Sequence, residues 1–217
     1  MLASVTTGGL KPSSFQEVSQ EIWFKLAFII AFVYVATVAA RTARLATARH
    51  GGSVNQLSNE VKGLIAVRAT LGVVFYAMLT WWMVRPHAPR WSILPLNPTI
   101  RWVAVLLLVP VLVLFTWSFR SIGASYRGGA GLHDEHELVT TGAYARVRHP
   151  IYLAFICVMV LVLFISANWV IGLSGLLLVI SIPAARVPIE ERELSDRFGE
   201  QWESYRERTG AFLPRLR

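Results

Sequence analysis

Charged residues are scarce in this chain, at 16% of the sequence against about 25% in an average soluble domain. Hydrophobic residues reach 54%, and the mean hydropathy is positive at +0.50. A chain of 217 residues has room for one or two domains, but its long apolar runs leave little length for a separate soluble one. The composition therefore indicates a membrane protein.

Cysteine is almost absent as well. The single cysteine, Cys157, lies inside an apolar run, which excludes an internal disulfide and a multi-cysteine metal site. Before the first apolar run there is no charged region followed by a cleavage site, and that run starts too late for a typical signal peptide. We therefore expect neither a bound metal nor a cleaved signal.

Acidic residues are outnumbered by basic ones, 13 against 21, and the net charge is +8. In a soluble protein this excess would raise the question of a nucleic-acid partner. Here the basic residues cluster at the ends of apolar runs, as they do beside membranes. The expected partners are membrane lipids, and no nucleic acid is expected.

Five apolar runs approach the roughly 20 residues that a bilayer-spanning helix needs. They cover residues 22–40, 63–84, 100–119, 151–167 and 169–185. The last two are joined by so little chain that they can only form a tight helical hairpin. Near the ends of the first two runs, Lys25 and Arg68 could reach lipid headgroups, although Arg68 could instead face a polar cavity. The sequence predicts an all-α, polytopic membrane protein with about five transmembrane helices.

Basic residues also indicate the orientation, because they concentrate in the loop 41–62, the loop 120–150 and the tail after residue 185. An odd number of spans places these regions on one side, which the positive-inside tendency makes the cytosol. Six tryptophans fall at or beyond the opposite ends of the runs, as an interfacial belt would: Trp23, Trp81, Trp82, Trp91, Trp102 and Trp169. We expect an integral protein of the bacterial inner membrane or the endoplasmic reticulum, with its N-terminus outside and its C-terminus cytosolic.

The tail carries an amphipathic pattern. Leu194, Phe198, Trp202 and Tyr205 recur at helical intervals and would form one apolar face, with Gly210 ending the helix. Such a helix could lie flat on the membrane surface. Alternatively, it could fold back over the cytosolic ends of the hairpin and close a pocket.

A polar loop precedes the fourth apolar run. Pro150 suits the first position of the fourth helix, because its missing N–H would have no partner there. The residues before it then lie at a helix N-terminus, which favours an anion. Tyr144, His149 and Tyr152 offer flat or polar-tipped surfaces that could hold an adenosine. Taken singly, Arg148 and His149 could also be mere anchors to phospholipid headgroups.

A second polar cluster follows the fifth run. Arg186 and Glu190 are four residues apart and share a face if the helix continues through Pro188. Pro183 and Pro188 would both disturb that helix, freeing carbonyls and opening space beside the pair. An isolated pair of this kind is more often a structural ion pair. Its position across the hairpin from His149 favours a functional role.

Together these motifs resemble the isoprenylcysteine carboxyl methyltransferase family, over roughly residues 118–215. The pattern Leu-Val-Thr-x-Gly-x-Tyr-x-x-x-Arg-His-Pro-x-Tyr at 138–152 is similar to the signature of that family. So are Arg186-x-x-x-Glu190-Glu191 and the later Phe198-Gly199, Trp202, Tyr205 and Phe212-Leu213-Pro214. Phospholipid N-methyltransferases share the same C-terminal layout.

The resemblance implies a membrane methyltransferase that uses S-adenosylmethionine and acts on a lipophilic or small acceptor, with a carboxylate favoured. It divides one integrated domain into a three-helix region over 1–119 and a core over 120–217, whose C-terminal helix covers a cytosolic cofactor pocket. The implied cofactor-binding residues are His136, Glu137, Leu138, Val139, Tyr144, His149, Pro150, Ile151, Tyr152 and Glu190. Arg186 and Glu190 are the implied catalytic residues, and Arg186 and Arg148 would bind the acceptor.

Two other functions remain open. A membrane sterol-type reductase using NADPH has a similar C-terminal region, but such proteins have Asn where this chain has Pro150-Ile151 before the last tyrosine of the loop. A non-enzymatic membrane protein could keep the same fold, although the joint presence of His149, Arg186 and Glu190 argues against it. Five spans are fewer than in larger eukaryotic members, so helices that help to accept a prenyl chain could be absent. The acceptor could be a lipid, an isoprenoid acid, an amine or a small thiol.

Overall fold

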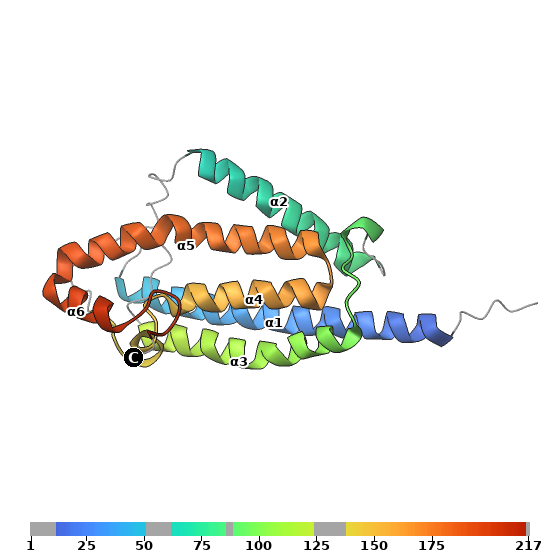
Figure 1. The fold of residues 1–217 in the computed structure, drawn as a ribbon, viewed down its shortest axis with the longest axis horizontal. Helices are drawn as coiled ribbons and strands as arrows, with labels where there is room; N and C mark the ends of the chain where they lie inside the picture. The colour runs from blue at the N-terminus through green and yellow to red at the C-terminus, as the bar shows by residue number, and fades with distance from the viewer. Residues whose placement is uncertain (1–11, 51–61, 86–88, 124–137, 216–217) are drawn as a thin grey trace, which may run out of the picture.

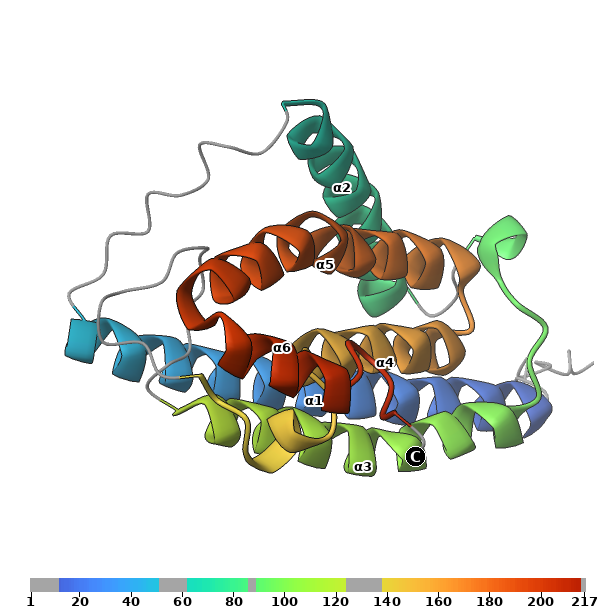
Figure 2. The same ribbon diagram turned by 60° about the vertical axis from the view of Figure 1, so that its left-hand side comes forward.

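The computed structural model describes residues 12–50, 62–85, 89–123 and 138–215, and within them the chain is helical with no β-strand. The long helices are α1 (Pro12–His50), α2 (Lys62–Val84), α3 (Pro98–Ile122), α4 (Pro150–Ser166) and α5 (Trp169–Phe198). The short ones are η2 (Arg90–Ser92), η4 (Gly142–Ala145) and α6 (Glu200–Arg208). Helices α1, α3, α4 and α5 lie side by side, whereas α2 leans away from α5 at its N-terminal end (Figures 1 and 2). The predicted all-α class is confirmed.

Four helical segments in the described ranges are long and apolar enough to cross a membrane: Val18–Leu45, Leu64–Val84, Pro98–Ile122 and Trp169–Phe198. Helix α4 is apolar but has only 17 residues, the lower end of the roughly 17–25 that span a bilayer. It packs against α3 on one side and α5 on the other. The polytopic membrane fold is confirmed, while the count of five spans stays a prediction.

Side chains from all five long helices meet in one apolar core. It includes Phe24 and Phe28 of α1, Phe75 and Trp82 of α2, Leu108 of α3, Val162 of α4 and Ile171 of α5. Helices α4 and α5 approach closely at Gly172, where an added Cβ would lie 2.2 Å from Leu163. Small residues permit this kind of contact between membrane helices. The core takes described residues from both sides of the expected boundary at residue 119, and the division at that boundary stays a prediction.

The hairpin between α4 and α5 turns within two residues, as its short connection predicts. Ala167 adopts a left-handed conformation, with φ at 47°, and Asn168 caps α5 by accepting from the N–H groups of Val170 and Ile171. The amide of Asn168 donates to Ser92 Oγ at 2.9 Å, and Leu94 N donates to Ala167 O at 2.7 Å. The segment around η2 therefore fastens the hairpin at the end opposite α6.

A polar cluster lies at the same end, between α1, α2 and α3. Glu21 accepts from Trp82 Nε1 at 2.6 Å and from Arg101 Nη1 at 2.8 Å, while Arg101 also donates to Ile165 O. Trp82 is only 1% exposed, so its place in an interfacial aromatic belt was predicted wrongly. Its indole N–H donates to the carboxylate of Glu21, so the indole needs no partner from the membrane–water boundary.

Neither alternative considered for Arg68 describes its contacts. Its side chain bridges α2 and α5, donating from Nε to Ser181 Oγ at 3.0 Å and from Nη2 to Ser181 O at 2.6 Å. Lys25 likewise donates to a backbone carbonyl, that of Arg85, at 2.8 Å. Both cations therefore contact groups of the protein, whereas a snorkelling side chain would contact lipid headgroups instead.

The C-terminal helix differs from the expected single amphipathic helix. Helix α5 continues through Pro183 and Pro188 to Phe198, and Gly199 breaks it with φ at 48° before α6 begins. Leu194 and Phe198 therefore belong to α5, and Trp202 and Tyr205 to α6. Glycine tolerates this left-handed conformation where other residues do not. The turn sends α6 back across the ends of the bundle (Figure 2), in agreement with the expected fold-back, while the closing of a pocket by α6 stays a prediction.

Candidate active site

The loop before α4 is fixed by the end of α3. Ser121 Oγ donates to Trp117 O at 2.8 Å and accepts from Ala143 N at 3.1 Å. Gly142 has φ at 62°, and a Cβ there would lie 2.2 Å from Ser121 Oγ. Only a glycine combines the left-handed backbone with so close an approach. The loop therefore enters η4 against the last turn of α3.

The chain after α6 holds this loop from the other side through backbone hydrogen bonds. Arg148 N donates to Gly210 O at 2.8 Å, and His149 N donates to Ala211 O at 3.0 Å. The hydroxyl of Tyr205 donates to Tyr144 O at 2.8 Å. Burial raises the pKa of this hydroxyl to about 12, so it stays a donor well above neutral pH. Helix α6 and the segment after it thus form a lid fastened to the loop.

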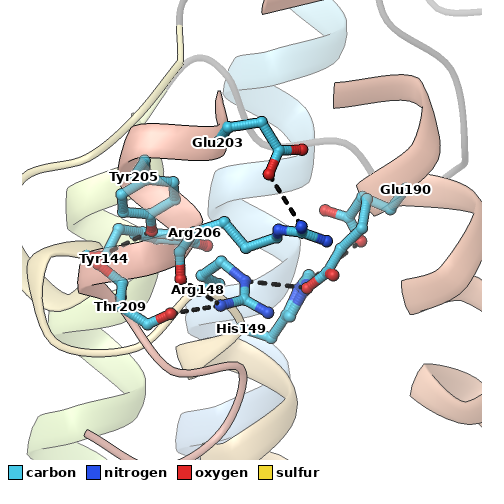
Figure 3. A network of polar contacts seen from close by, with 9 residues as sticks. Tyr144, Arg148, His149, Glu190, Glu203, Tyr205, Arg206 and Thr209 are labelled. Atoms are coloured by element: carbon cyan, nitrogen blue, oxygen red, sulfur yellow. Dashed lines mark hydrogen bonds and ion pairs between the residues drawn. The ribbon is translucent and has the colours of Figure 1, made fainter. Parts of the chain in front are cut away.

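Arg148 connects this lid to α5. Its guanidinium donates to the backbone carbonyls of Arg206 and Thr209, and from Nε to Glu191 Oε1 at 3.0 Å. The side chains of Arg148 and Glu191 are only 10% and 22% exposed. These donors form hydrogen bonds with groups of the protein, as Figure 3 shows. Arg148 is therefore tied to the protein through its Nε and Nη1 atoms, and its implied role in binding the acceptor stays a prediction.

His149 lies between two adjacent carboxylates of α5. Its Nε2 is 3.0 Å from Glu191 Oε1, and its Nδ1 is 4.0 Å from Glu190 Oε2. Because an ionised carboxylate only accepts hydrogen bonds, the Nε2 atom carries the proton of this contact. The ring also packs near Tyr152 and Phe212, with centroids 5.9 and 5.8 Å away. The imidazole is thereby held in one orientation, with its Nδ1 edge toward Glu190.

Arg186 and Glu190 line one cavity together with the loop and the start of α4. The cavity has a volume of about 280 Å³. Its polar wall is formed by Arg148, His149, Arg186 and Glu190, and its other lining residues are Ile122, Tyr144, Ile151, Tyr152, Phe155, Val179 and Ile182. The carboxylate of Glu190 is 44% exposed and faces this space. A cavity with a charged end and a long apolar wall suits ligands that carry both charged and apolar groups.

Most of the residues expected from the sequence meet at this cavity: Tyr144, Arg148, His149, Ile151, Tyr152, Arg186 and Glu190 line it. Pro150 begins α4 as expected, but it is buried and does not line the cavity. Leu138 lies in a separate hollow against α6, with Thr140 and Tyr205. Val139 is half-buried and lines neither hollow. His136 and Glu137 lie outside the described residues, so their expected roles stay predictions.

Sequence reasoning gave no role to Glu191, although it stands in the Arg186–Glu191 motif. The motif does not say which of two adjacent carboxylates turns toward His149, because that depends on how α5 is rotated. The apolar wall of Phe155, Val179 and Ile182 was missed for the same reason. Among the described residues, no group of three or more His, Cys, Asp or Glu side chains could hold a metal ion.

Part of the chain is similar to a family of known proteins. Residues 103–196 match the model of the isoprenylcysteine carboxyl methyltransferase family. The chain is 34% identical over 97 residues to the protein-S-isoprenylcysteine O-methyltransferase of Schizosaccharomyces pombe, covering 45% of this chain and 39% of that protein. It is 32% identical over 81 residues to protein-S-isoprenylcysteine O-methyltransferase B of Arabidopsis thaliana, covering 37% of this chain and 41% of the relative. The chain thus spans about two fifths of the length of these relatives.

The fold has a solved counterpart as well. The structure of the eukaryotic intramembrane Ras methyltransferase, isoprenylcysteine carboxyl methyltransferase, solved without a monobody, matches 92% of this chain and 72% of its own, with a TM-score of 0.54. Sequence identity in this superposition is 18%, so the likeness concerns the fold. The resemblance expected from the motifs is confirmed: residues 103–196 match the model of the isoprenylcysteine carboxyl methyltransferase family, and both relatives carry the corresponding names.

Proposed function

We propose that this chain is an integral membrane methyltransferase that moves a methyl group from S-adenosylmethionine to the carboxylate of a lipophilic acceptor. One observation carries the proposal: Arg186 and Glu190 of α5 share a cavity with His149 and Tyr152 at the start of α4. The relatives are named as O-methyltransferases, and the cavity offers what such a reaction needs.

The charges of the cavity fit the proposed cofactor, which carries an ammonium and a sulfonium group and supplies an activated methyl group when bound. Glu190 presents a carboxylate to the cavity, and the neighbouring Glu191 is already engaged by Arg148 and His149. A cation would therefore be drawn to Glu190, where Tyr144, His149 and Tyr152 provide aromatic surface. The cavity's 280 Å³ is close to the lower end, about 300 Å³, of ordinary small-molecule sites.

Arg186 is suited to the acceptor. A guanidinium binds a carboxylate through two parallel hydrogen bonds and so fixes the direction of its oxygen atoms. Arg186 lies one helical turn before Glu190, and both side chains line the same wall. Methyl transfer by in-line displacement depends chiefly on positioning, and it needs no nucleophile from the protein. The chain's contribution is then to hold the carboxylate beside Glu190 and to exclude water with the α6 lid.

The apolar wall suits the rest of the acceptor. Phe155 of α4 and Val179 and Ile182 of α5 continue the cavity away from the charged end, toward the interior of the bundle. An isoprenyl thioether, the group in the names of the relatives, would place its hydrocarbon there and its carboxylate at Arg186. We propose an S-isoprenylcysteine carboxylate as the first acceptor to test.

Calorimetry on the detergent-purified protein tests the cofactor, with S-adenosylhomocysteine compared against NADPH. We expect binding of S-adenosylhomocysteine alone, and transfer of a labelled methyl group to an N-acylated S-isoprenylcysteine. Binding of NADPH without a response to S-adenosylhomocysteine would favour the reductase alternative. Failure to bind either compound would favour the non-enzymatic one.

The proposed site lies on the cytosolic side, with the N-terminus outside. The arginines of the tail and of the loops 41–62 and 120–150 support this orientation. Trp91 and Arg208 are both exposed. Trp91 lies in η2 and accepts from Trp169 Nε1 at the start of α5, whereas Arg208 ends α6, which follows the other end of α5. In a Cys157→Ala background, an impermeant thiol reagent applied from outside should label Trp91→Cys and spare Arg208→Cys. The reverse labelling, or labelling of both, would contradict the orientation.

A further inference from the structure

A second hollow lies between α1 and α3, apart from the candidate active site. This α1/α3 groove has a volume of about 670 Å³, and its wall includes Arg41, Tyr34 and Val38 of α1 with Thr116, Phe119 and Arg120 of α3. The two helices lie side by side in Figure 1. No residue lines both this groove and the cavity of Arg186 and Glu190.

Two arginines, one from each helix, line the groove. Arg41 and Arg120 are both exposed, and neither forms a hydrogen bond or an ion pair with any described residue. Among the described residues, no carboxylate lines the groove. The positive charge there is thus not balanced by the part of the chain that the structure describes, and it is available to an anion.

The hydroxyl groups of the groove are already committed. Thr116 Oγ1 donates to Leu112 O at 2.8 Å, so the hydroxyl of Tyr34, 2.6 Å from Thr116 Oγ1, must donate to it. Thr42 donates to Val38 O at 3.0 Å. A hydroxyl carries a single donor hydrogen. The charged donors that the lining residues leave for a ligand are therefore the two guanidinium groups.

The groove also presents apolar side chains beside the arginines. Val38 and Phe119 contribute hydrocarbon and aromatic surface, and Val35, Val38 and Ala39 of α1 pack beside Phe115 and Phe119 of α3. Both helices contain candidate membrane spans. A groove with two cations and apolar side chains beside them matches an amphiphile with an anionic head and hydrocarbon tails.

We propose that the α1/α3 groove is a binding site for an anionic phospholipid, with its phosphate between Arg41 and Arg120 and an acyl chain along Val38 and Phe119. Basic pockets between membrane helices bind anionic headgroups in this way. The proposal is independent of the proposed methyl transfer. The bound lipid would brace the last turn of α3, whose Ile122 lines the active-site cavity and whose Ser121 holds the loop before α4.

Native mass spectrometry of the full chain in detergent tests the site, with phosphatidylglycerol and phosphatidylcholine of identical acyl chains as probes. We expect one tightly held phosphatidylglycerol and at least about ten-fold weaker binding of phosphatidylcholine. Removing the charge with Arg41→Gln or Arg120→Gln should weaken phosphatidylglycerol binding roughly five-fold each, the effect of about one charge at a membrane surface. Arg41→Lys should retain most of the binding.

Arg44→Gln is the matched control, because Arg44 is an exposed arginine of α1 that does not line the groove. It should leave phosphatidylglycerol binding within about two-fold, and its melting temperature gives the stability reference. Thr37→Phe fills the groove without changing charge and should displace the lipid, which keeps the test valid if an arginine variant folds poorly. Equal binding of the two lipids would overturn the proposal, as would a loss in Arg44→Gln as large as in Arg41→Gln, or competition by inorganic phosphate at the lipid's own concentration.

Discussion

The Nε2 atom of His149 lies 3.0 Å from the Oε1 atom of Glu191, which joins the residue before α4 to the charged end of α5. The same oxygen accepts from Arg148 Nε at 3.0 Å. One carboxylate oxygen thus fixes two consecutive residues of the loop, and the second of them faces Glu190. The geometry of the candidate active site depends on this contact, which joins two residues about 40 positions apart in the sequence.

Glu191→Gln tests the importance of this carboxylate. The amide keeps the shape of the side chain but loses its charge, leaving the nearly buried Arg148 without a counter-ion. We expect a loss of about 1.5–3 kcal/mol in the free energy of unfolding, the value of a hydrogen bond to a charged group. Affinity for S-adenosylhomocysteine should fall as well, because Arg148 and His149 line the cavity. Thermal melting and calorimetry measure the two effects.

Glu203→Gln is the control for that substitution. Glu203 pairs with Arg206 at 2.8 Å, but both side chains are about half exposed, at 45% and 50%. Exposed pairs contribute at most about 1 kcal/mol. If Glu203→Gln lowered the melting temperature as far as Glu191→Gln does, the carboxylate of Glu191 would have no special role.

The apolar runs predicted the positions of the long helices well and their ends less well. Helix α2 at Lys62–Val84 and α4 at Pro150–Ser166 lie within one residue of the predicted runs at both ends. Helices α1 and α5 extend far beyond their apolar runs, because a helix can continue into polar sequence beyond the membrane-spanning part. The break at Gly199 could not be inferred, since the spacing of Leu194, Phe198 and Trp202 is the same with or without it.

Some features of the candidate site could likewise be predicted from the sequence and others could not. Arg186 and Glu190 could be placed together from their spacing, and His149 could be placed opposite them from the short hairpin. The contacts of Arg148 and His149 with Gly210 and Ala211 run between backbone groups. Every residue but proline carries the same backbone donor and acceptor. The side-chain pattern of the sequence therefore does not predict these backbone hydrogen bonds. The lid was therefore only one of two alternatives before the structure was known.

Gly142→Ala should disturb the loop through the contact with α3. The added Cβ would meet Ser121 Oγ at 2.2 Å, and alanine disfavours the φ of 62°. The left-handed conformation alone costs roughly 1–2 kcal/mol, so we expect a melting temperature lower by about 2–8 °C. Gly72→Ala is the control, because nothing lies within 4 Å of a Cβ there. That change should be neutral or stabilising, and an equal loss in both variants would argue against the contact.

Tyr205→Phe should show a characteristic pH dependence. The folded protein holds the proton of Tyr205 up to a pKa of about 12, whereas the ordinary value is 10.0. Between these values the unfolded chain releases a proton that the folded chain retains, so stability falls as the pH rises. Tyr205→Phe should cost about 0.5–1.5 kcal/mol at neutral pH, the value of one hydrogen bond. Chemical denaturation at about pH 8, 10 and 11 should show that the difference in free energy of unfolding between the variant and the wild-type protein shrinks as the pH rises. A constant difference would contradict the assignment.

Arg186 and Glu190 can be separated by substitution, because the proposed roles differ. Glu190→Gln should weaken S-adenosylhomocysteine binding about ten-fold or more, since it removes a charge-assisted contact worth about 1.5–3 kcal/mol. Arg186→Ala should leave that affinity within a few-fold while nearly abolishing methyl transfer, because it removes the group that orients the acceptor. Arg186→Lys should restore little transfer, since an ammonium cannot reproduce the planar fork of a guanidinium.

The outcome depends on comparing affinity, turnover and melting temperature in the same three variants. A purely architectural pair would lose stability in all three, with affinity and turnover falling together, because Arg186 and Glu190 occupy one helical face beside the loop. Divided roles require the melting temperatures to stay close to that of the wild-type protein while affinity follows Glu190 and turnover follows Arg186. Parallel losses in all three properties would leave the acceptor site unassigned and make the pair a clasp between α5 and the loop.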